Sequence, residues 1–277
     1  MNNLTDKEFE LIRDYIKKRF GINLSDEKKT LVYSRLRVIM EELKLDSFEE
    51  YYKMLFKDKD GDLNKRFIDR ISTNHTFFMR EKEHFEYFAK TVLPYIEERH
   101  ATTKDIRLWC AACSSGEEAY TLQIILQEYF ANKPDWNLEI LATDISNNVL
   151  NIANDGIYAT TALSEMPTSW IRNYFEAKDQ HTMVAKKTLK DNITFSRFNF
   201  IEDQFNFRKP FQVIFCRNVM IYFDQIVRST LVNKFYSISE EGAYLFVGQS
   251  ESLSNSNSKY EYVMPAVYRK PFNIKKD

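Results

Sequence analysis

Apolar side chains recur every three to four positions through the first part of the chain, which is the spacing of amphipathic helices. Thr5 and Glu8 have the spacing of a capping box before the first helix, and Gly21 is a typical stop after it. Ser25 can cap a second helix, and the charged run 57–62 is expected to form a polar loop before a fourth. The apolar positions of the four expected helices are Phe9, Ile12, Ile16 and Phe20; Val32, Leu36, Ile39, Met40 and Leu43; Phe48, Tyr51, Tyr52 and Leu55; and Leu63, Phe67, Ile68 and Ile71.

From about residue 85 the pattern changes, because short apolar runs of strand length alternate with longer runs of helical spacing. A mostly parallel sheet with helices on both faces is the typical product of such alternation. The expected strands are 106–110, 138–142, 193–197, 211–216, 243–247 and 266–270, and the helices between them include 117–130, 146–154 and 224–238. We therefore divide the chain into a helical domain at 1–75, a linker and lead-in helix at 76–90, and an α/β domain at 91–277.

The segment 157–194 interrupts this alternation. Its later part, from Thr182 to Leu189, contains a run that can form one strand of a hairpin. The sequence therefore predicts a small antiparallel β-subdomain inserted into the α/β domain.

Composition and charge narrow the class of protein. The 22 Phe and 16 Tyr among 277 residues favour a compact chain over a disordered one. The 39 basic and 40 acidic residues give a net charge of −1, which argues against a protein that coats nucleic acid. The sequence has neither an apolar run of about 18 residues nor an N-terminal apolar signal core. We therefore expect a cytoplasmic protein that does not insert into a membrane, and we expect a monomer.

An unusual turn follows the first expected strand. Five small residues, Ala111 to Ser115, and then Gly116 separate this strand from a helical run that begins at Glu117. Small side chains let a ligand approach the backbone, and a helix start offers unpaired N–H groups. Glu117 adds a carboxylate at the rim of such a site. A tightly packed strand-to-helix corner would have the same sequence, and the dinucleotide fingerprint G-x-G-x-x-G is absent.

Polar residues also follow the later strands, and in a parallel sheet ligands bind outside the carboxyl ends of the strands. Asp144 comes 28 residues after Gly116 and can accept hydrogen bonds from both hydroxyls of a ribose, or cap the next helix instead. The other residues that can line this site are Asn199, Phe200, Arg217, Asn218 and Tyr222. A core position is an equally good interpretation of Tyr222. Because a P-loop is absent, the pattern favours an adenosyl compound such as S-adenosylmethionine over ATP.

The cysteines and histidines do not predict a metal site. Cys110 and Cys113 have C-x-x-C spacing, but a second pair is absent from the sequence and Cys216 is the third and last cysteine. The four histidines are scattered. We therefore interpret the cysteines as small packing residues and His75 as a partly buried histidine rather than a ligand.

One segment departs from the neutral charge of the chain. Residues 13–37 carry eight basic and three acidic side chains, a local charge of +5. A solvated helical face explains this composition, and so does a docking surface for an acidic helix or for nucleic acid. Aromatic residues are sparse here, which weakens the nucleic-acid alternative.

Four segments together resemble the CheR family of chemoreceptor glutamate O-methyltransferases, and the resemblance extends over roughly residues 5–270. The matching segments are Ser72-Thr-Asn-His-Thr-Phe-Phe-Met-Arg-Glu81, Trp109-Cys-Ala-Ala-Cys-Ser-Ser-Gly-Glu-Glu118, Ala142-Thr-Asp-Ile145 and Ile214-Phe-Cys-Arg-Asn-Val-Met-Ile-Tyr-Phe-Asp224. The resemblance implies an all-α N-terminal domain, then a Rossmann-like α/β domain that uses S-adenosylmethionine and carries an antiparallel β-subdomain. It also implies methylation of glutamate carboxylates on the cytoplasmic helices of chemoreceptors, as part of chemotaxis signal transduction.

The resemblance also assigns residues. The implied cofactor contacts are Asn74, Thr76, Arg80, Glu117, Asp144, Asn199, Phe200, Arg217 and Asn218. Arg80 would face the methionine carboxylate, which suits a guanidinium fork, and Tyr222 would line the methyl-transfer site, so these two are the expected catalytic residues. The expected receptor-binding residues are Lys28, Lys29, Arg35 and Arg37.

Two further points depend on this resemblance. Some family members bind a receptor's C-terminal pentapeptide on a glycine-containing turn of the β-subdomain. The corresponding stretch, 176–183, has no glycine, so we expect direct substrate binding without a tether. Two other functions stay open, namely a non-catalytic adenosyl-binding regulator and a methyltransferase acting on another protein or on nucleic acid. The neutral charge argues against nucleic acid.

Overall fold

The computed structural model describes residues 4–59, 61–253 and 258–273 of the chain. Within these ranges, the N-terminal part is a bundle of four α-helices: α1 (Asp6–Phe20), α2 (Lys29–Leu43), α3 (Phe48–Lys57) and α4 (Asp62–Ile71). The predicted apolar stripes form its core, except that Leu43 and Leu63 are only partly buried at its edge. Asp60 of the expected polar loop lies outside the described residues, as do 1–3 and 274–277 at the ends of the predicted domains.

The ends of α1 follow the predicted local chemistry, whereas the start of α2 does not. The Thr5 N–H donates to the Glu8 carboxylate at 2.9 Å, which completes the capping box, and Gly21 ends the helix at φ 75°. The prediction for Ser25 is wrong. A turn of 3₁₀ helix, η1 (Asp26–Lys28), precedes α2, and the Ser25 side chain makes no capping hydrogen bond to a described residue.

A mostly parallel sheet forms the centre of the α/β domain, which confirms the predicted fold class. Among the described residues it has seven strands in the order β6-β2-β1-β7-β8-β10-β9. These strands are β1 (Leu108–Ala111), β2 (Ile140–Asp144), β6 (Ile193–Arg197), β7 (Phe211–Phe215), β8 (Ser239–Phe246), β9 (Glu261–Met264) and β10 (Val267–Arg269). The first five in this order are parallel, and β10 and β9 add an antiparallel edge. The sequence pattern missed β9, because most of its side chains are exposed and it lacks an apolar alternation.

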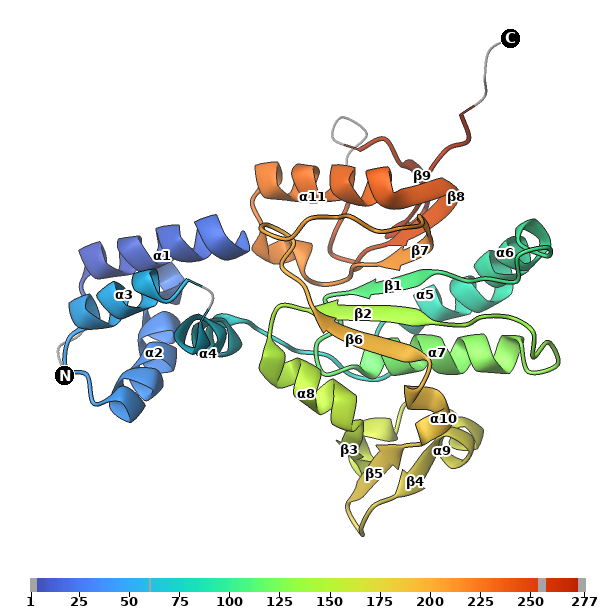
Figure 1. Cartoon of the computed structure of the whole chain (residues 1–277), viewed down its shortest axis with the longest axis horizontal. Helices are drawn as coiled ribbons and strands as arrows, with labels where there is room; N and C mark the ends of the chain where they lie inside the picture. The colour runs from blue at the N-terminus through green and yellow to red at the C-terminus, as the bar shows by residue number, and fades with distance from the viewer. Residues whose placement is uncertain (1–3, 60, 254–257, 274–277) are drawn as a thin grey trace.

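Helices cover both faces of this sheet. The lead-in helix has three parts: α5 (Lys82–Tyr87), the π-helical turn η2 (Phe88–Val92) and α6 (Leu93–Arg99). The later helices are α7 (Glu117–Tyr129), α8 (Asn147–Asp155) and α11 (Gln225–Ile238). Figure 1 shows α7 and α8 on one side of the sheet and α11 on the other. All four residues of β1 are buried, and the Trp109 ring lies inside a group of phenylalanine rings. This core holds the central strands rigidly, and the turns at their carboxyl ends with them.

The interrupting segment is an antiparallel subdomain, as expected. Its elements are β3 (Ile157–Ala159), η3 (Thr160–Leu163), α9 (Thr168–Tyr174), β4 (Phe175–Ala177), β5 (Thr182–Ala185) and α10 (Lys187–Lys190), and its strand order is β3-β5-β4. It extends from the α7 and α8 side of the main sheet in Figure 1. The turn from β4 to β5 is held by Asp179, which accepts the N–H groups of His181 and Thr182 at 2.8 Å each.

The helical bundle lies next to the turns that follow the parallel strands (Figure 1). Lys17 of α1 forms an ion pair with Asp224 at 2.9 Å, and the Ser146 hydroxyl donates to Asp69 of α4 at 2.7 Å. These two contacts hold the bundle against the loops that follow the parallel strands. No helix in the described part of the chain is long and apolar enough to cross a membrane.

Candidate active site

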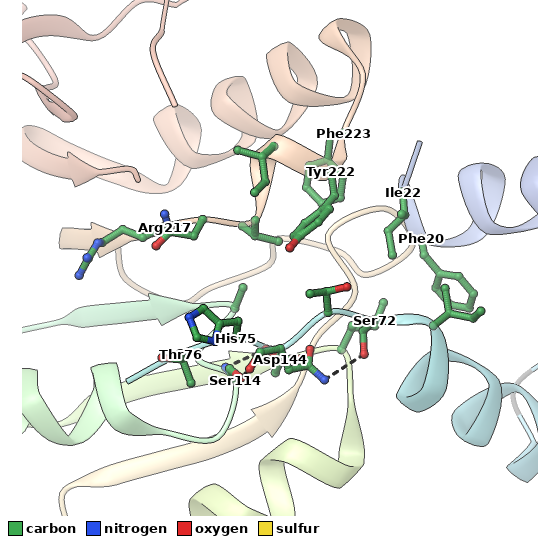
Figure 2. A pocket seen from close by; sticks show the side chains of 18 of the residues that line it. Phe20, Ile22, Ser72, His75, Thr76, Ser114, Asp144, Arg217, Tyr222 and Phe223 are labelled. Carbon is green, nitrogen blue, oxygen red and sulfur yellow. Dashed lines mark hydrogen bonds between the residues drawn. The ribbon is translucent and has the colours of Figure 1, made fainter. Parts of the chain in front are cut away.

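A cavity of about 500 Å³ lies where the bundle, the linker and the sheet meet. This volume is in the range of small-molecule sites. Figure 2 shows that its walls come from three directions: Phe20 and Ile22 from the bundle, His75 and Thr76 from the linker, and the strand ends opposite them. The cavity therefore lies at the edge of the sheet where the sequence predicted a ligand.

The backbone around this cavity is strained. Five of the eight non-glycine residues with positive φ in the described part of the chain lie in or next to segments that line it, namely Met79, Glu81, Ala112, Ser114 and Asn218. Such conformations cost on the order of 1–3 kcal/mol each and cluster at functional sites. Gly116 has φ 97°, and a Cβ there would lie 2.9 Å from the Ala153 Cβ. The turn after β1 is thus tightly packed at Gly116, whereas Ala112 to Ser114 line the cavity.

Asp144, at the end of β2, is a buried hydrogen-bond acceptor. One carboxylate oxygen accepts the Ser114 N–H at 2.9 Å and the other accepts the Ser146 N–H at 3.0 Å (Figure 2 shows the first). Burial raises the pKa of this carboxyl above its ordinary value, and these N–H groups oppose the rise. Ser146, not Asp144, caps α8 by accepting the Val149 N–H. The Asp144 carboxylate therefore keeps the capacity to accept a further hydrogen bond from the side of the cavity.

Arg217, after β7, sits in a buried charge cluster. Its side chain is 1% exposed, and its guanidinium donates to Glu118 at 3.0 Å and to Glu81 at 3.1 Å. It also donates to the Arg80 carbonyl and covers the Phe85 ring. The cluster ties the linker to the sheet.

The two carboxyls of the cluster behave differently. Burial raises the pKa of Glu118 and the Arg217 cation only partly opposes it. Burial would also raise the pKa of Glu81, but a hydrogen bond from Asn218 and the charge of Arg217 hold it below its ordinary value. Two carboxyls share one guanidinium, and Glu118 lines the cavity. Within this cluster, Glu81 and Glu118 therefore face one guanidinium, whereas Lys28, Arg35 and Arg80 add positive charge to the rest of the cavity lining.

Eight of the nine predicted cofactor contacts line the cavity, and the eight are Asn74, Thr76, Arg80, Asp144, Asn199, Phe200, Arg217 and Asn218. The exception is Glu117. Its carboxylate accepts the Ser115 hydroxyl at 2.7 Å, and its neighbour Glu118 lines the cavity instead. The first turn of α7 thus places the two carboxylates of the Gly-Glu-Glu run differently, and the cofactor contact at Glu117 stays a prediction.

Several of these lining residues already use their polar atoms within the protein. The Asn199 amide donates to the Arg19 carbonyl at 2.9 Å, and its oxygen accepts the Ile201 N–H at 3.0 Å. Arg80 donates to the His75 carbonyl at 2.7 Å, which folds the linker back on itself. These residues shape the wall of the cavity as well as facing it.

The basic segment is not one surface. Lys28 lines the cavity, whereas Lys29 pairs with Asp6 and Arg37 pairs with Glu41, each at 2.6 Å. Arg35 lines the cavity but donates to the carbonyls of Ile71 and Ser72, so it holds the start of the linker. Of the four predicted substrate contacts, only Lys28 and Arg35 are placed at the cavity.

Two other predictions concern aromatic side chains. Tyr222 lines the cavity and also packs against the core cluster beside it, and its carbonyl accepts the Asn23 N–H at 2.7 Å, so the bundle fixes its backbone. Figure 2 shows the Tyr222 ring above the linker. The interpretation of His75 as partly buried is wrong, since the residue is exposed and lines the cavity.

The three cysteines are free and buried. Burial raises the pKa of each thiol well above its ordinary value. The Cys110 thiol donates to Glu118 at 3.3 Å. A protonated, buried thiol is a poor nucleophile, so these residues serve packing.

Comparison with known proteins links both parts of the chain to one family. The model of the CheR methyltransferase all-alpha domain matches residues 7–72, and that of the CheR methyltransferase SAM binding domain matches residues 74–268. A chemotaxis protein methyltransferase of Borreliella burgdorferi is 40% identical over 271 residues, which cover 97% of this chain and 95% of that protein. A chemotaxis protein methyltransferase of Salmonella typhimurium is 34% identical over 269 residues, covering 96% and 90%. Chemotaxis protein methyltransferase 1 of Pseudomonas aeruginosa is 32% identical over 260 residues, covering 92% and 94%.

Proposed function

The chain belongs to the CheR methyltransferase family and is an S-adenosylmethionine-dependent chemotaxis methyltransferase, and from this premise we propose that it methylates glutamate carboxylates on the helices of chemoreceptors. The observation that carries the proposal is the cavity between the bundle and the sheet. It combines a buried carboxylate for a ribose, a second carboxylate at Glu118, and a side that faces the basic start of α2.

The residues present fit the cofactor. Asp144 would accept the ribose hydroxyls with its remaining acceptor capacity, and the Phe200 ring would border the adenine. Glu118 would face the cationic methionine end, because it is the carboxylate of the Arg217 cluster that lines the cavity and can accept a hydrogen bond from the ammonium group. Arg80 would balance the methionine carboxylate.

When bound, S-adenosylmethionine supplies a methyl group that passes from its sulfur to a substrate carboxylate oxygen, which leaves S-adenosylhomocysteine. A glutamate with an ordinary pKa of about 4.3 is ionised at neutral pH, so this chain needs no general base. Its task is alignment and exclusion of water, which together can supply on the order of 7–11 kcal/mol. Tyr222 and Phe223 form an apolar wall beside the bundle and would exclude water there.

The mouth of the cavity supports a protein substrate. Three large apolar side chains that line the cavity are also exposed: Leu31 at 38%, Phe77 at 43% and Ile221 at 45%. Lys28 adds a cation beside them. An amphipathic helix that presents a glutamate between apolar neighbours would match this mouth. The substrate would bind directly, because the β4–β5 turn has no glycine and is closed by Asp179.

The proposal is tested by transfer of a labelled methyl group to a receptor cytoplasmic fragment. The matched control is the same fragment with its modifiable glutamates changed to alanine. We expect base-labile label that disappears with the glutamates, as glutamate methyl esters require. Cofactor binding without such label would favour a non-catalytic adenosyl-binding regulator or a different substrate.

A further inference from the structure

The loop after β7 presents Arg217, Asn218 and Tyr222 to the cavity, yet its own conformation is unfavourable. Asn218 adopts φ 56°, in the left-handed region, which asparagine enters more readily than other residues with a side chain but still at a cost relative to the right-handed region. A neighbouring contact has to hold the loop in this shape, because the strain alone favours its relaxation.

Glu251, outside the cavity, makes that contact. It is 2% exposed, and its carboxylate accepts the Asn218 N–H at 2.9 Å, the Gly248 N–H at 2.6 Å and the Ile221 N–H at 3.1 Å. No described lysine, arginine or histidine forms an ion pair with it. A buried carboxylate is costly unless such bonds satisfy it, and here the backbone of the loop supplies two of the three.

Gly248 makes this arrangement possible. A Cβ at this position would lie 2.5 Å from the Asn218 amide nitrogen, 2.9 Å from the Asn218 backbone N and 2.9 Å from a Glu251 oxygen. The segment after β8 and the loop after β7 therefore interlock, with the carboxylate between them.

We propose that Glu251 is a positioning residue for methyl transfer, which sets the loop that carries Asn218 and Tyr222 at the cavity wall. The inference rests on the proposed function. Asp144 and Ser114, which would hold the ribose, come from the ends of β2 and β1 and make no contact with Glu251. Loss of Glu251 should therefore affect transfer more than cofactor binding.

The test is the Glu251→Gln variant of the full chain. The amide keeps the shape of the side chain but turns one acceptor into a donor that faces an N–H group. We expect a roughly 10- to 100-fold fall in kcat toward the receptor fragment, since small misplacements near reacting groups have effects of this size. Calorimetry should give a smaller change, up to about threefold, in the Kd for S-adenosylhomocysteine, because Asn218 is one of the predicted cofactor contacts but the ribose anchor at Asp144 is intact.

Two further variants separate positioning from general stability. Glu240→Gln changes a β8 carboxylate that accepts from His100 at 2.8 Å, far from the cavity lining, and should lower the unfolding temperature without lowering kcat. Gly248→Ala keeps the Glu251 carboxylate in the chain but presses on Asn218 and on a Glu251 oxygen, and should reproduce the fall in kcat.

Hydrogen exchange of the 217–223 segment supplies a readout that needs no substrate. We expect faster exchange in Glu251→Gln than in Glu240→Gln. Equal exchange in the two variants overturns the inference, as does an unchanged kcat. Absence of receptor labelling by the unaltered chain overturns the proposed function instead, while the exchange result still decides the role of Glu251.

Discussion

Two groups of charged residues differ in almost every physical respect. The basic segment at the start of the chain is dense in the sequence, and its ion pair between Arg37 and Glu41 is exposed, with 55% and 47% of the two side chains in solvent. The Arg217 cluster has one cation, separated in sequence from both of its carboxylates, and that cation is 1% exposed. The density of charge along the chain therefore says little about where electrostatic energy is concentrated.

The difference follows from solvation. An exposed pair exchanges good hydration for a modest attraction and is screened by salt. A buried pair has lost its hydration, so removal of one partner leaves the other uncompensated. The comparison predicts large effects at the buried cluster and small ones along the basic segment.

The largest effect is expected for Arg217→Met. The change leaves Glu81 and Glu118 buried without their cation, and we expect a loss of about 3–5 kcal/mol in the free energy of unfolding. Denaturant unfolding followed by circular dichroism measures it. Arg37→Met is the matched control at an exposed pair and should leave the unfolding midpoint unchanged. A similar loss in both variants would break the comparison.

The second prediction concerns pH. Burial, and then the Arg217 cation, lower the pKa of His84 to about 4 from an ordinary 6.5. Above pH 6.5 the imidazole is neutral in both states and contributes nothing. As pH falls from 6.5 toward 4, His84 becomes protonated in the unfolded chain but stays neutral in the folded chain, so the free energy of unfolding decreases.

By pH 4.5 the loss in the free energy of unfolding that is due to His84 amounts to about 2–3 kcal/mol. The measurement is the unfolding free energy at pH 7 and pH 4.5, for the unaltered chain and for His84→Gln. We expect the variant to lose less between the two values. An equal loss would mean that His84 accepts its proton in the folded state, despite its burial beside Arg217.

These groups also show what the sequence could predict. The four-helix bundle and the parallel sheet follow from local spacing, and the turn after β1 follows from a run of small residues. The roles of Glu81, Glu118 and Glu251 depend on contacts between segments more than 30 residues apart, which no local pattern records. The same is true of Arg35, which stands in a segment that looks like an exposed basic surface but donates to the Ile71 and Ser72 carbonyls at the start of the linker.

Asp144 sharpens the comparison, because it is a buried charge held by N–H groups without a cation. We expect Asp144→Ala to keep the fold and to weaken cofactor binding by about 10- to 100-fold, since two hydrogen bonds to a charged acceptor would be lost. Calorimetry with S-adenosylhomocysteine measures the change. Asp179→Ala, at the distant β4–β5 turn, is the control, and an unchanged affinity for Asp144→Ala would remove its role at the ribose.

The smallest effect is expected within the basic segment itself. Lys28 lines the cavity whereas Lys29 is turned toward Asp6, so Lys28→Glu should raise the KM for the receptor by about 3- to 10-fold and Lys29→Glu should not. Rates at several salt concentrations measure it, since attraction to an acidic substrate weakens with ionic strength. Equal increases in KM for the two variants, and a further equal increase when the charges of Arg35 and Arg37 are reversed, would mean that the segment attracts the substrate through its total positive charge. That result would restore the docking surface that the sequence suggested, and the contrast between the two charge groups would then concern stability alone.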